Sequence, residues 1–348
     1  MDRSTVAERK DGFEPFLPHP LVRGGDRQTI LAALRPRRAD LVTRREQAVL
    51  IDAGKDYTGF APERAVRLLG FYTRGLTRGR RRGLVLLLHG WEGSSHSSYN
   101  LLLGSALIRQ GYDVFRLNLR DHGPTHHLNP GFFYATLIEE AATAVDWVSQ
   151  LAGEAPFYIV GASMGGNFAL RLALWHGRQP FHNLRHVIAI NPALDPNHTS
   201  DALDRQPLYL HYFRRRWLAS LRRKQALFPE LYDFTPLTKL KTMREMTEWL
   251  VTRYGKFPDA WSYYESYSVA GDRLSRGLTV PTTIITAADD PIIPVEDFHA
   301  LAPHPLLDVQ IHPSGGHVGF TDAFPLRHCL PALVSRVLQR AGEASAEG

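Results

Sequence analysis

Short apolar runs alternate along the chain with longer segments in which apolar residues recur every three or four positions. The run at residues 83–90, GLVLLLHG, is continuously apolar and bounded by glycines, which is typical of a strand covered on both faces. The same pattern predicts an antiparallel hairpin at residues 48–51 and 65–72, and further strands at 113–119, 157–160, 186–190, 280–287 and 308–311. Helices are predicted at residues 98–110, 135–151, 167–176, 297–301 and 323–340. This alternation predicts an α/β fold in which helices flank a mostly parallel central sheet.

The regular alternation stops at Asn191-Pro192. From about residue 195 to residue 278 the chain is too long for a simple crossover between strands, and its pattern is mostly helical. We interpret this segment as a helical cap inserted into the core. The predicted organisation is an N-terminal arm with the first strand, a core in two parts, the cap insertion and a frayed tail, at residues 1–59, 60–194 with 279–342, 195–278 and 343–348.

A serine stands at the junction between one predicted strand and the next helix, in the stretch FYIVGASMGGNFAL. Gly161, Gly165 and Gly166 surround Ser163 with residues that lack a Cβ, so the chain can turn sharply and hold the hydroxyl at the tip. The helix that follows directs unpaired backbone N–H groups at the space beside the hydroxyl, where an oxyanion would form. The stretch predicts a nucleophile elbow, although a G-x-S-x-G match alone also fits a small-residue turn.

Two later strand ends supply an acid and a histidine. The strand at residues 280–287 runs into AADDPIIP, and the last strand is followed by PSGGHVGF. Ser163, Asp290 and His317 therefore follow one another in the order nucleophile, acid, histidine. We predict that His317 acts as general base and that Asp290 orients its imidazole. Asp289 is the alternative acid, and the other aspartate would then cap a loop.

Four stretches together resemble the α/β-hydrolase superfamily over nearly the full length of the chain, and within it the YheT-like branch, which is related to eukaryotic alpha/beta-hydrolase domain-containing lipid hydrolases. They are FLPHPLVRGGDRQTIL, HGWEGSSHSSY, GASMGGN and AADDPIIP. The resemblance implies an oxyanion hole made by the backbone N–H groups of Trp91 and Met164. It also implies carboxylester hydrolysis through an acyl-enzyme on Ser163, with short-chain esters or acylglycerols as substrates.

The chain departs from that branch in two places. Trp91 stands where the residue after His-Gly is usually aliphatic, and Asp121-His122-Gly123 replaces a segment rich in glycine and serine. Both departures are expected to change the shape of the acyl pocket. An acyltransferase, a thioesterase or an amidase could use the same acyl-enzyme, and the fold can serve as a binding module after losing its chemistry, although the intact triad argues against that.

The composition, 44% hydrophobic and 22% charged, predicts a soluble globular protein. Lysine and arginine number 41 against 35 acidic residues, and this spread-out excess of +6 does not predict nucleic-acid binding. Cys329 is the single cysteine, which excludes an intrachain disulfide and a cysteine zinc site. His126 and His127 lack a second ligand cluster, so we expect no metal and no organic cofactor. The first residues lack the apolar core of a signal peptide, and we expect a cytoplasmic protein.

A basic amphipathic helix is predicted within the cap segment. Its apolar face carries Leu210, Phe213, Trp217, Leu218 and Leu221, interleaved with Arg214, Arg215, Arg216, Arg222, Arg223 and Lys224. Such a helix can lie on an anionic membrane surface, cover an apolar substrate channel, or simply use arginine for solubility.

Overall fold

The computed structural model describes residues 13–34, 39–77, 79 and 81–347. Within these residues one large sheet has the strand order β1-β2-β4-β3-β5-β6-β7-β8, with β1 and β2 antiparallel and the strands from β4 to β8 parallel. The mostly parallel sheet confirms the predicted fold class. Its strands are β1 (Gln47–Lys55), β2 (Ala65–Thr73), β3 (Gly83–Leu88), β4 (Tyr112–Leu117), β5 (Phe157–Ala162), β6 (Leu184–Ile190), β7 (Thr282–Ala287) and β8 (Leu307–His312).

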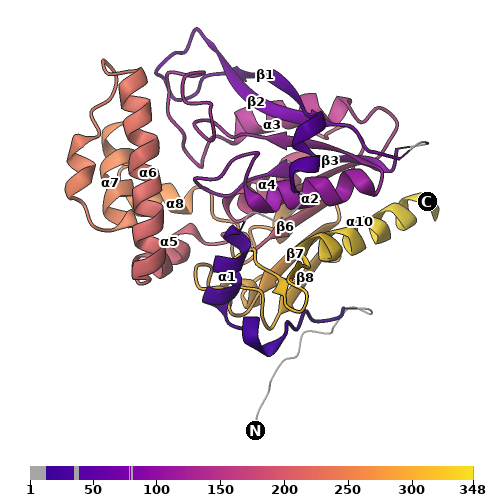
Figure 1. Cartoon of the computed structure of the whole chain (residues 1–348). Coiled ribbons are helices and arrows are strands. Elements are labelled where there is room, and N and C mark those ends of the chain that lie inside the picture. The colour runs from indigo at the N-terminus through magenta and orange to yellow at the C-terminus, as the bar shows by residue number, and fades with distance from the viewer. Residues whose placement is uncertain (1–12, 35–38, 78, 80, 348) are drawn as a thin grey trace.

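Helices cover both faces of the sheet (Figure 1). The side chains of β3 alternate between two apolar clusters, because successive residues of a strand point to opposite faces. Leu84, Leu86 and Leu88 pack with helices α3 (Ile138–Gln150) and α4 (Met164–His176). Val85 and Leu87 pack with α2 (Ser98–Arg109) and α10 (Leu330–Glu347). This burial on both faces explains the continuous apolar run in the sequence.

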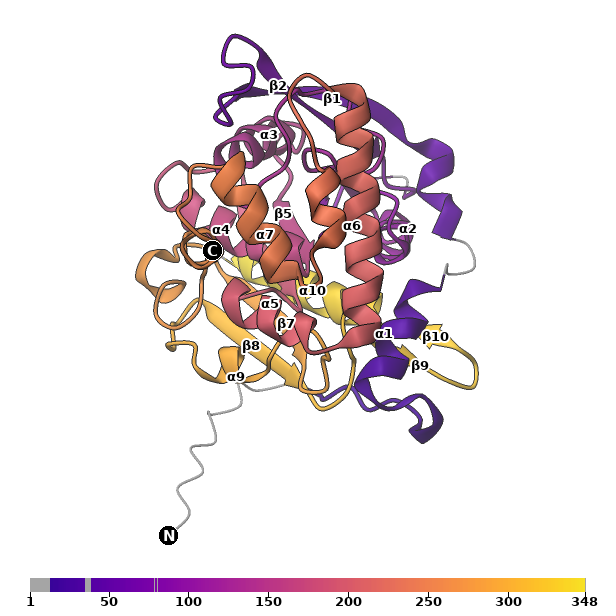
Figure 2. The ribbon, with the colours of Figure 1, turned by 90° about the vertical axis from the view of Figure 1, so that its left-hand side faces the viewer.

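The segment between β6 and β7 forms four α-helices that lie beyond one end of the sheet, and we call them the inserted helices (Figures 1 and 2). Side chains cap the N-termini of three of these helices. Asp195 accepts hydrogen bonds from two backbone N–H groups of α5, Thr242 and Glu245 form a capping box on α7, and Asp259 caps α8. The helices are α5 (Pro196–Asp204), α6 (Pro207–Leu227), α7 (Met243–Arg253) and α8 (Ala260–Glu265), with 3-10 turns at Thr235–Lys239 and Ser275–Gly277.

The N-terminal arm packs against the far end of the chain. Its helix α1 (Gly25–Ala33) carries Gln28, whose amide donates to the carbonyls of Val22 and Thr321 and accepts from the Thr321 N–H. The Phe16 N–H donates to Nδ1 of His312 at the end of β8. The arm thereby holds the loop that follows β8. Short 3-10 turns at Pro20–Val22, Ala39–Leu41 and Thr43–Arg45 complete it.

The prediction of a helix from residue 323 was wrong at its start. A small hairpin of β9 (Thr321–Asp322) and β10 (Arg327–His328) comes first, and α10 begins at Leu330. Pro325 explains part of the difference, because proline pushes the residue before it out of helical geometry. Pro331 lies in the first turn of α10, where its missing N–H costs nothing. The helix continues to Glu347, through most of the segment expected to fray, and Gly348 lies outside the described residues. Residues 1–12 of the arm lie outside them too.

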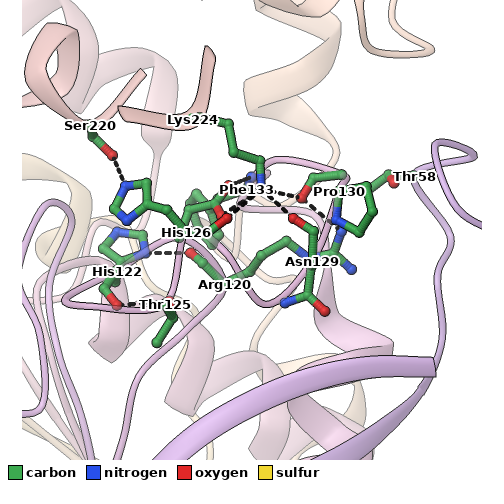
Figure 3. Close-up of polar contacts among 12 residues, drawn as sticks. Thr58, Arg120, His122, Thr125, His126, Asn129, Pro130, Phe133, Ser220 and Lys224 are labelled. Atoms are coloured by element: carbon green, nitrogen blue, oxygen red, sulfur yellow. Dashed lines mark hydrogen bonds and ion pairs between the residues drawn. The ribbon is translucent and has the colours of Figure 1, made fainter. Parts of the chain in front are cut away.

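A buried lysine joins the longest inserted helix to the core (Figure 3). Lys224 of α6 is 1% exposed and its ammonium lies 2.8 Å from Oδ1 of Asp121, in the loop after β4. The same ammonium also donates to the backbone carbonyls of His126, Asn129 and Gly131. Burial lowers the pKa of Lys224 and raises the pKa of Asp121 to about 6, while their attraction opposes both shifts.

We expect Lys224→Met to destabilise the protein by about 3–5 kcal/mol, because it leaves a buried carboxylate and its neighbouring carbonyls without their shared donor. Urea unfolding monitored by circular dichroism measures this change. Arg222→Met is the matched control, since Arg222 is exposed on the same helix and should cost only about 0.5 kcal/mol or less. Equal loss of stability in both variants would show that Lys224 does not anchor α6.

Candidate active site

The elbow around Ser163 depends on its glycines. Ser163 follows β5 and caps α4 with φ 56° and ψ −122°, a conformation that is strained for a residue with a Cβ. A Cβ on Gly161 would lie 2.0 Å from the Gly165 carbonyl oxygen, and one on Gly165 would lie 2.5 Å from the His89 carbonyl oxygen. The close approach of β5, α4 and the loop after β3 therefore requires glycine at both positions, which exposes the serine hydroxyl at the tip of the turn.

The structure brings the serine, the histidine and one aspartate together at the carboxyl edge of the sheet. Nε2 of His317 lies 2.9 Å from Oγ of Ser163, and Nδ1 lies 2.8 Å from Oδ2 of Asp290. Asp290 follows β7 and His317 follows β8. When Nδ1–H donates to the carboxylate, Nε2 can accept the serine proton. Three residues far apart in sequence thus form one hydrogen-bonded relay.

The two neighbouring aspartates have different surroundings. Oδ1 of Asp290 accepts the backbone N–H groups of Ile292 and Ile293, which leaves Oδ2 for His317. Asp289 instead accepts hydrogen bonds from the loop that carries His317, at the N–H groups of Gly315 and Gly316 and the hydroxyl of Ser314. The geometry therefore favours Asp290 as the partner of His317 and Asp289 as a cap of its loop.

Two residues that the sequence did not single out support this relay. Asn191, just after β6, donates its side-chain amide to Oδ2 of Asp290 and to the Gly316 carbonyl, and it accepts from the Val318 N–H. Thr29 of α1 accepts the His317 N–H through its hydroxyl. A polar residue directly after a buried strand was a usable signal for Asn191. Nothing local in the sequence pointed to Thr29.

The loop after β3 lies against the serine. A Cβ on Gly90 would lie 3.0 Å from Cβ of Ser163. Outside the helices and strands of the described residues, no backbone hydrogen bond is donated by the Trp91 N–H. Met164 is the first residue of α4, where a helix leaves its N–H without an internal acceptor. His89 accepts the Leu119 N–H, and burial lowers its pKa to about 4, so it shapes this loop as a neutral ring.

A cavity opens beside the serine between the core and the inserted helices. Its volume is about 140 Å³, and a cavity of roughly 150 Å³ accepts a benzene-sized molecule. Trp91 lies at this boundary, stacked on Phe213 of α6 with ring centroids 5.4 Å apart. No charged side chain is among the described residues that line the cavity. The lining combines aliphatic side chains with the aromatic rings of Trp91, Phe132, Phe133, Tyr134, Phe213, Trp217, Tyr263, Tyr264 and Tyr267.

Comparison with known proteins finds similar sequences and a matching fold model. The model of the alpha/beta hydrolase fold matches residues 83–229. An Escherichia coli (strain K12) protein named "Putative esterase YheT" is 26% identical over 245 residues, which cover 68% of this chain and 70% of that protein. The chain has the α/β-hydrolase fold and is similar to the YheT-like branch. A Synechocystis protein named "Putative esterase slr0264" is 27% identical over 267 residues, which cover 69% of this chain and 70% of that protein.

Solved structures share the fold at low identity. An esterase from Pyrococcus furiosus has a TM-score of 0.51 and 16% identity, over 89% of this chain and 97% of that chain. Proline iminopeptidase from Mycobacterium smegmatis has a TM-score of 0.55 and 16% identity, over 86% of this chain and 100% of that chain. These neighbours show the fold alone, and the two relatives above are named as putative esterases.

Two further features of the structure bear on other classes of site. Across residues 13–34, 39–77, 79 and 81–347, no group of three or more histidine, cysteine or acidic side chains is arranged to hold a metal ion. No helix within the same ranges is long and apolar enough to cross a membrane.

Proposed function

We propose that this chain is a serine hydrolase that cleaves carboxylic esters through an acyl-enzyme on Ser163. The observation that carries the proposal is the relay from Asp290 through His317 to Ser163, which opens on an uncharged cavity. The spacing of its atoms suits proton transfer from the hydroxyl to the imidazole. The inserted helices are proposed as the cap that closes this cavity.

In the proposed reaction Oγ of Ser163 attacks the ester carbonyl while Nε2 of His317 takes the hydroxyl proton. The oxyanion that forms would accept the N–H groups of Trp91 and Met164. Collapse of this intermediate breaks the bond to the alcohol oxygen, which receives the proton from His317. A water molecule then attacks the acyl-enzyme by the same steps, releasing the acid and restoring the serine. Asp290 stabilises the imidazolium in both halves.

The cavity indicates the class of acyl group. Its aromatic and aliphatic lining gives an uncharged chain a favourable environment, whereas a buried carboxylate would find no partner there. The volume of about 140 Å³ suits a short acyl group better than a long rigid one. We therefore propose neutral short-chain esters, or acylglycerol-like lipids whose remaining bulk stays outside, as substrates.

We expect p-nitrophenyl esters of increasing acyl length to show a maximum in kcat/KM at short chains of about four to six carbons, because each buried CH₂ contributes about 0.8 kcal/mol until the cavity is full. Release of p-nitrophenol measures the rates. Trp91→Leu is the informative variant. It replaces an aromatic ring of the cavity lining with a smaller side chain, so the maximum in kcat/KM should move to longer acyl chains. Absence of hydrolysis across the whole panel would contradict the ester substrate class.

The proposed contact with an anionic membrane rests on the outer face of α6. Three of the arginines singled out in the sequence donate to backbone carbonyls: Arg214 to Leu240 and Thr238, Arg216 to Glu92, and Arg223 to Gly123. Arg215 and Arg222 are exposed, and Leu208 and Tyr212, which are 60% and 51% exposed, precede Arg215 by two turns and one turn of the same helix. The face therefore offers cations next to apolar side chains.

We expect Arg215→Gln with Arg222→Gln to weaken sedimentation with phosphatidylglycerol vesicles roughly 30-fold, since each cation near such a surface contributes about 1 kcal/mol. The control replaces Arg109 and Arg185, which are exposed on α2 and β6, with glutamine. Equal pelleting of the wild type and both variants would remove the membrane contact.

A further inference from the structure

A basic basin lies at the edge of the sheet that is opposite the serine. It has a volume of about 450 Å³ and is lined by Arg45, Gln47, Tyr72, Arg74 and Arg81. Gln47 begins β1, and Arg74 follows the end of β2. The basin contributes nothing to the proposed ester chemistry. Its volume falls within the range of about 300–1,000 Å³ that is usual for small-molecule sites.

Hydrogen bonds to a buried carboxylate fix the part of the lining formed by Tyr72 and Arg81. The buried carboxylate of Asp113 accepts hydrogen bonds from the Tyr72 hydroxyl, the Gly75 N–H and the Arg81 guanidinium, at 2.6, 2.8 and 2.8 Å. Burial, followed by the bond to Asp113, raises the pKa of Tyr72 to about 12, so this hydroxyl stays protonated. Arg81 also donates to the carbonyls of Leu151 and Ala152. This part of the lining is close to neutral, because the buried carboxylate of Asp113 balances the charge of the Arg81 guanidinium.

The rest of the lining carries positive charge that is not balanced. Among the described residues, the Arg45 and Arg74 guanidinium groups form no ion pair. The acid nearest to Arg45 in sequence, Glu46, is bonded to Arg116 and His96 instead. No acidic side chain is among the described residues that line the basin. Two unpaired guanidinium groups and one amide therefore face a common space.

Two guanidinium forks beside an amide donor suit a dianionic phosphate, since each fork can donate two parallel hydrogen bonds to phosphate oxygens. We propose that this basin binds a phosphate-bearing ligand through Arg45, Arg74 and Gln47. The volume leaves room for more than a bare phosphate ion. The shared chemistry is a phosphate group, whether on a small phosphorylated molecule or on a lipid head group.

The ligand would lie far from the reacting atoms. Thr73 of β2 pairs with Val114 near the start of β4, whereas Ser163 follows the end of β5. The strand order puts β4 and β3 between β2 and β5, a lateral distance of about 14 Å at the usual strand spacing. Binding at the basin therefore does not compete with substrate, and it can be measured whether or not Ser163 is a nucleophile.

Isothermal titration with pyrophosphate in a phosphate-free buffer at physiological salt tests the proposal. We expect the wild type to bind, and Arg45→Gln with Arg74→Gln to weaken the affinity at least about tenfold through the loss of two charge-assisted contacts. Arg109→Gln with Arg185→Gln is the matched control, because it removes two exposed arginines outside the basin and should leave the affinity unchanged. Thermal unfolding checks that each variant is folded.

The proposal would be overturned if the wild-type protein did not bind pyrophosphate. It would also be overturned if the control variant lost as much affinity for pyrophosphate as the Arg45→Gln with Arg74→Gln variant. A second titration uses phosphatidic acid vesicles with and without pyrophosphate. Vesicle binding that pyrophosphate displaces, and that needs Arg45 and Arg74, identifies a lipid head group as the source. Pyrophosphate binding without such vesicle binding identifies a free phosphorylated molecule.

Discussion

Replacing Ser163 with alanine is expected to lower kcat for p-nitrophenyl ester hydrolysis by about a millionfold, to the level left by binding and oxyanion donors alone. The reason is that the proposed acyl-enzyme cannot form without Oγ, which lies 2.9 Å from Nε2 of His317. The same change should abolish labelling by a fluorophosphonate probe, which reacts with activated serines. Steady-state kinetics and probe labelling measure the two effects.

The matched control is Ser200→Ala. Ser200 lines the same cavity, but its hydroxyl donates to Tyr264 and not to the relay. Its activity should stay within a few-fold of the wild type. Full labelling of the Ser163→Ala protein would sink the proposed mechanism, because another nucleophile would then react with the probe.

Asp290→Asn is expected to lower kcat by about 10⁴-fold while the protein stays folded. The amide would favour the wrong tautomer of His317, with the proton on Nε2, so this nitrogen could no longer accept from Ser163. The amide can also take the place of the carboxylate at the two backbone N–H groups that Oδ1 accepts. The measurement is kcat at saturating substrate, with the thermal unfolding midpoint recorded alongside.

Asp289→Asn is the companion variant and should keep most of the activity. Among the described residues its carboxylate accepts hydrogen bonds only from the loop at residues 314–316, so the change acts on loop stability and not on the imidazole. A reversal, in which Asp289→Asn abolishes hydrolysis and Asp290→Asn does not, would reassign the acid.

The position of α6 affects both the cavity and the stability of the protein. The cavity is lined from the core side by Trp91 and from α6 by Phe213 and Trp217. Lys224, on the same helix, is tied to the loop after β4. A change that loosens this attachment is therefore expected to alter the cavity as well as the stability, because both depend on where α6 lies.

The sequence by itself determined the fold class and the three candidate residues. Strands covered on both faces appear as continuous apolar runs, and the glycines around Ser163 reflect contacts between backbones that leave no room for a Cβ. Parallel strands also place their carboxyl ends at one edge, so acid and histidine could be predicted from strand ends alone.

Only the tertiary structure decided which aspartate faces His317, that Asn191 and Thr29 hold the relay, and that three arginines of α6 are bonded to backbone carbonyls. It also showed that α10 starts after a hairpin pinned by Gln28. Each of these depends on a contact between segments far apart in the chain. Local periodicity records which face of an element is buried, but not which distant polar group will lie opposite it.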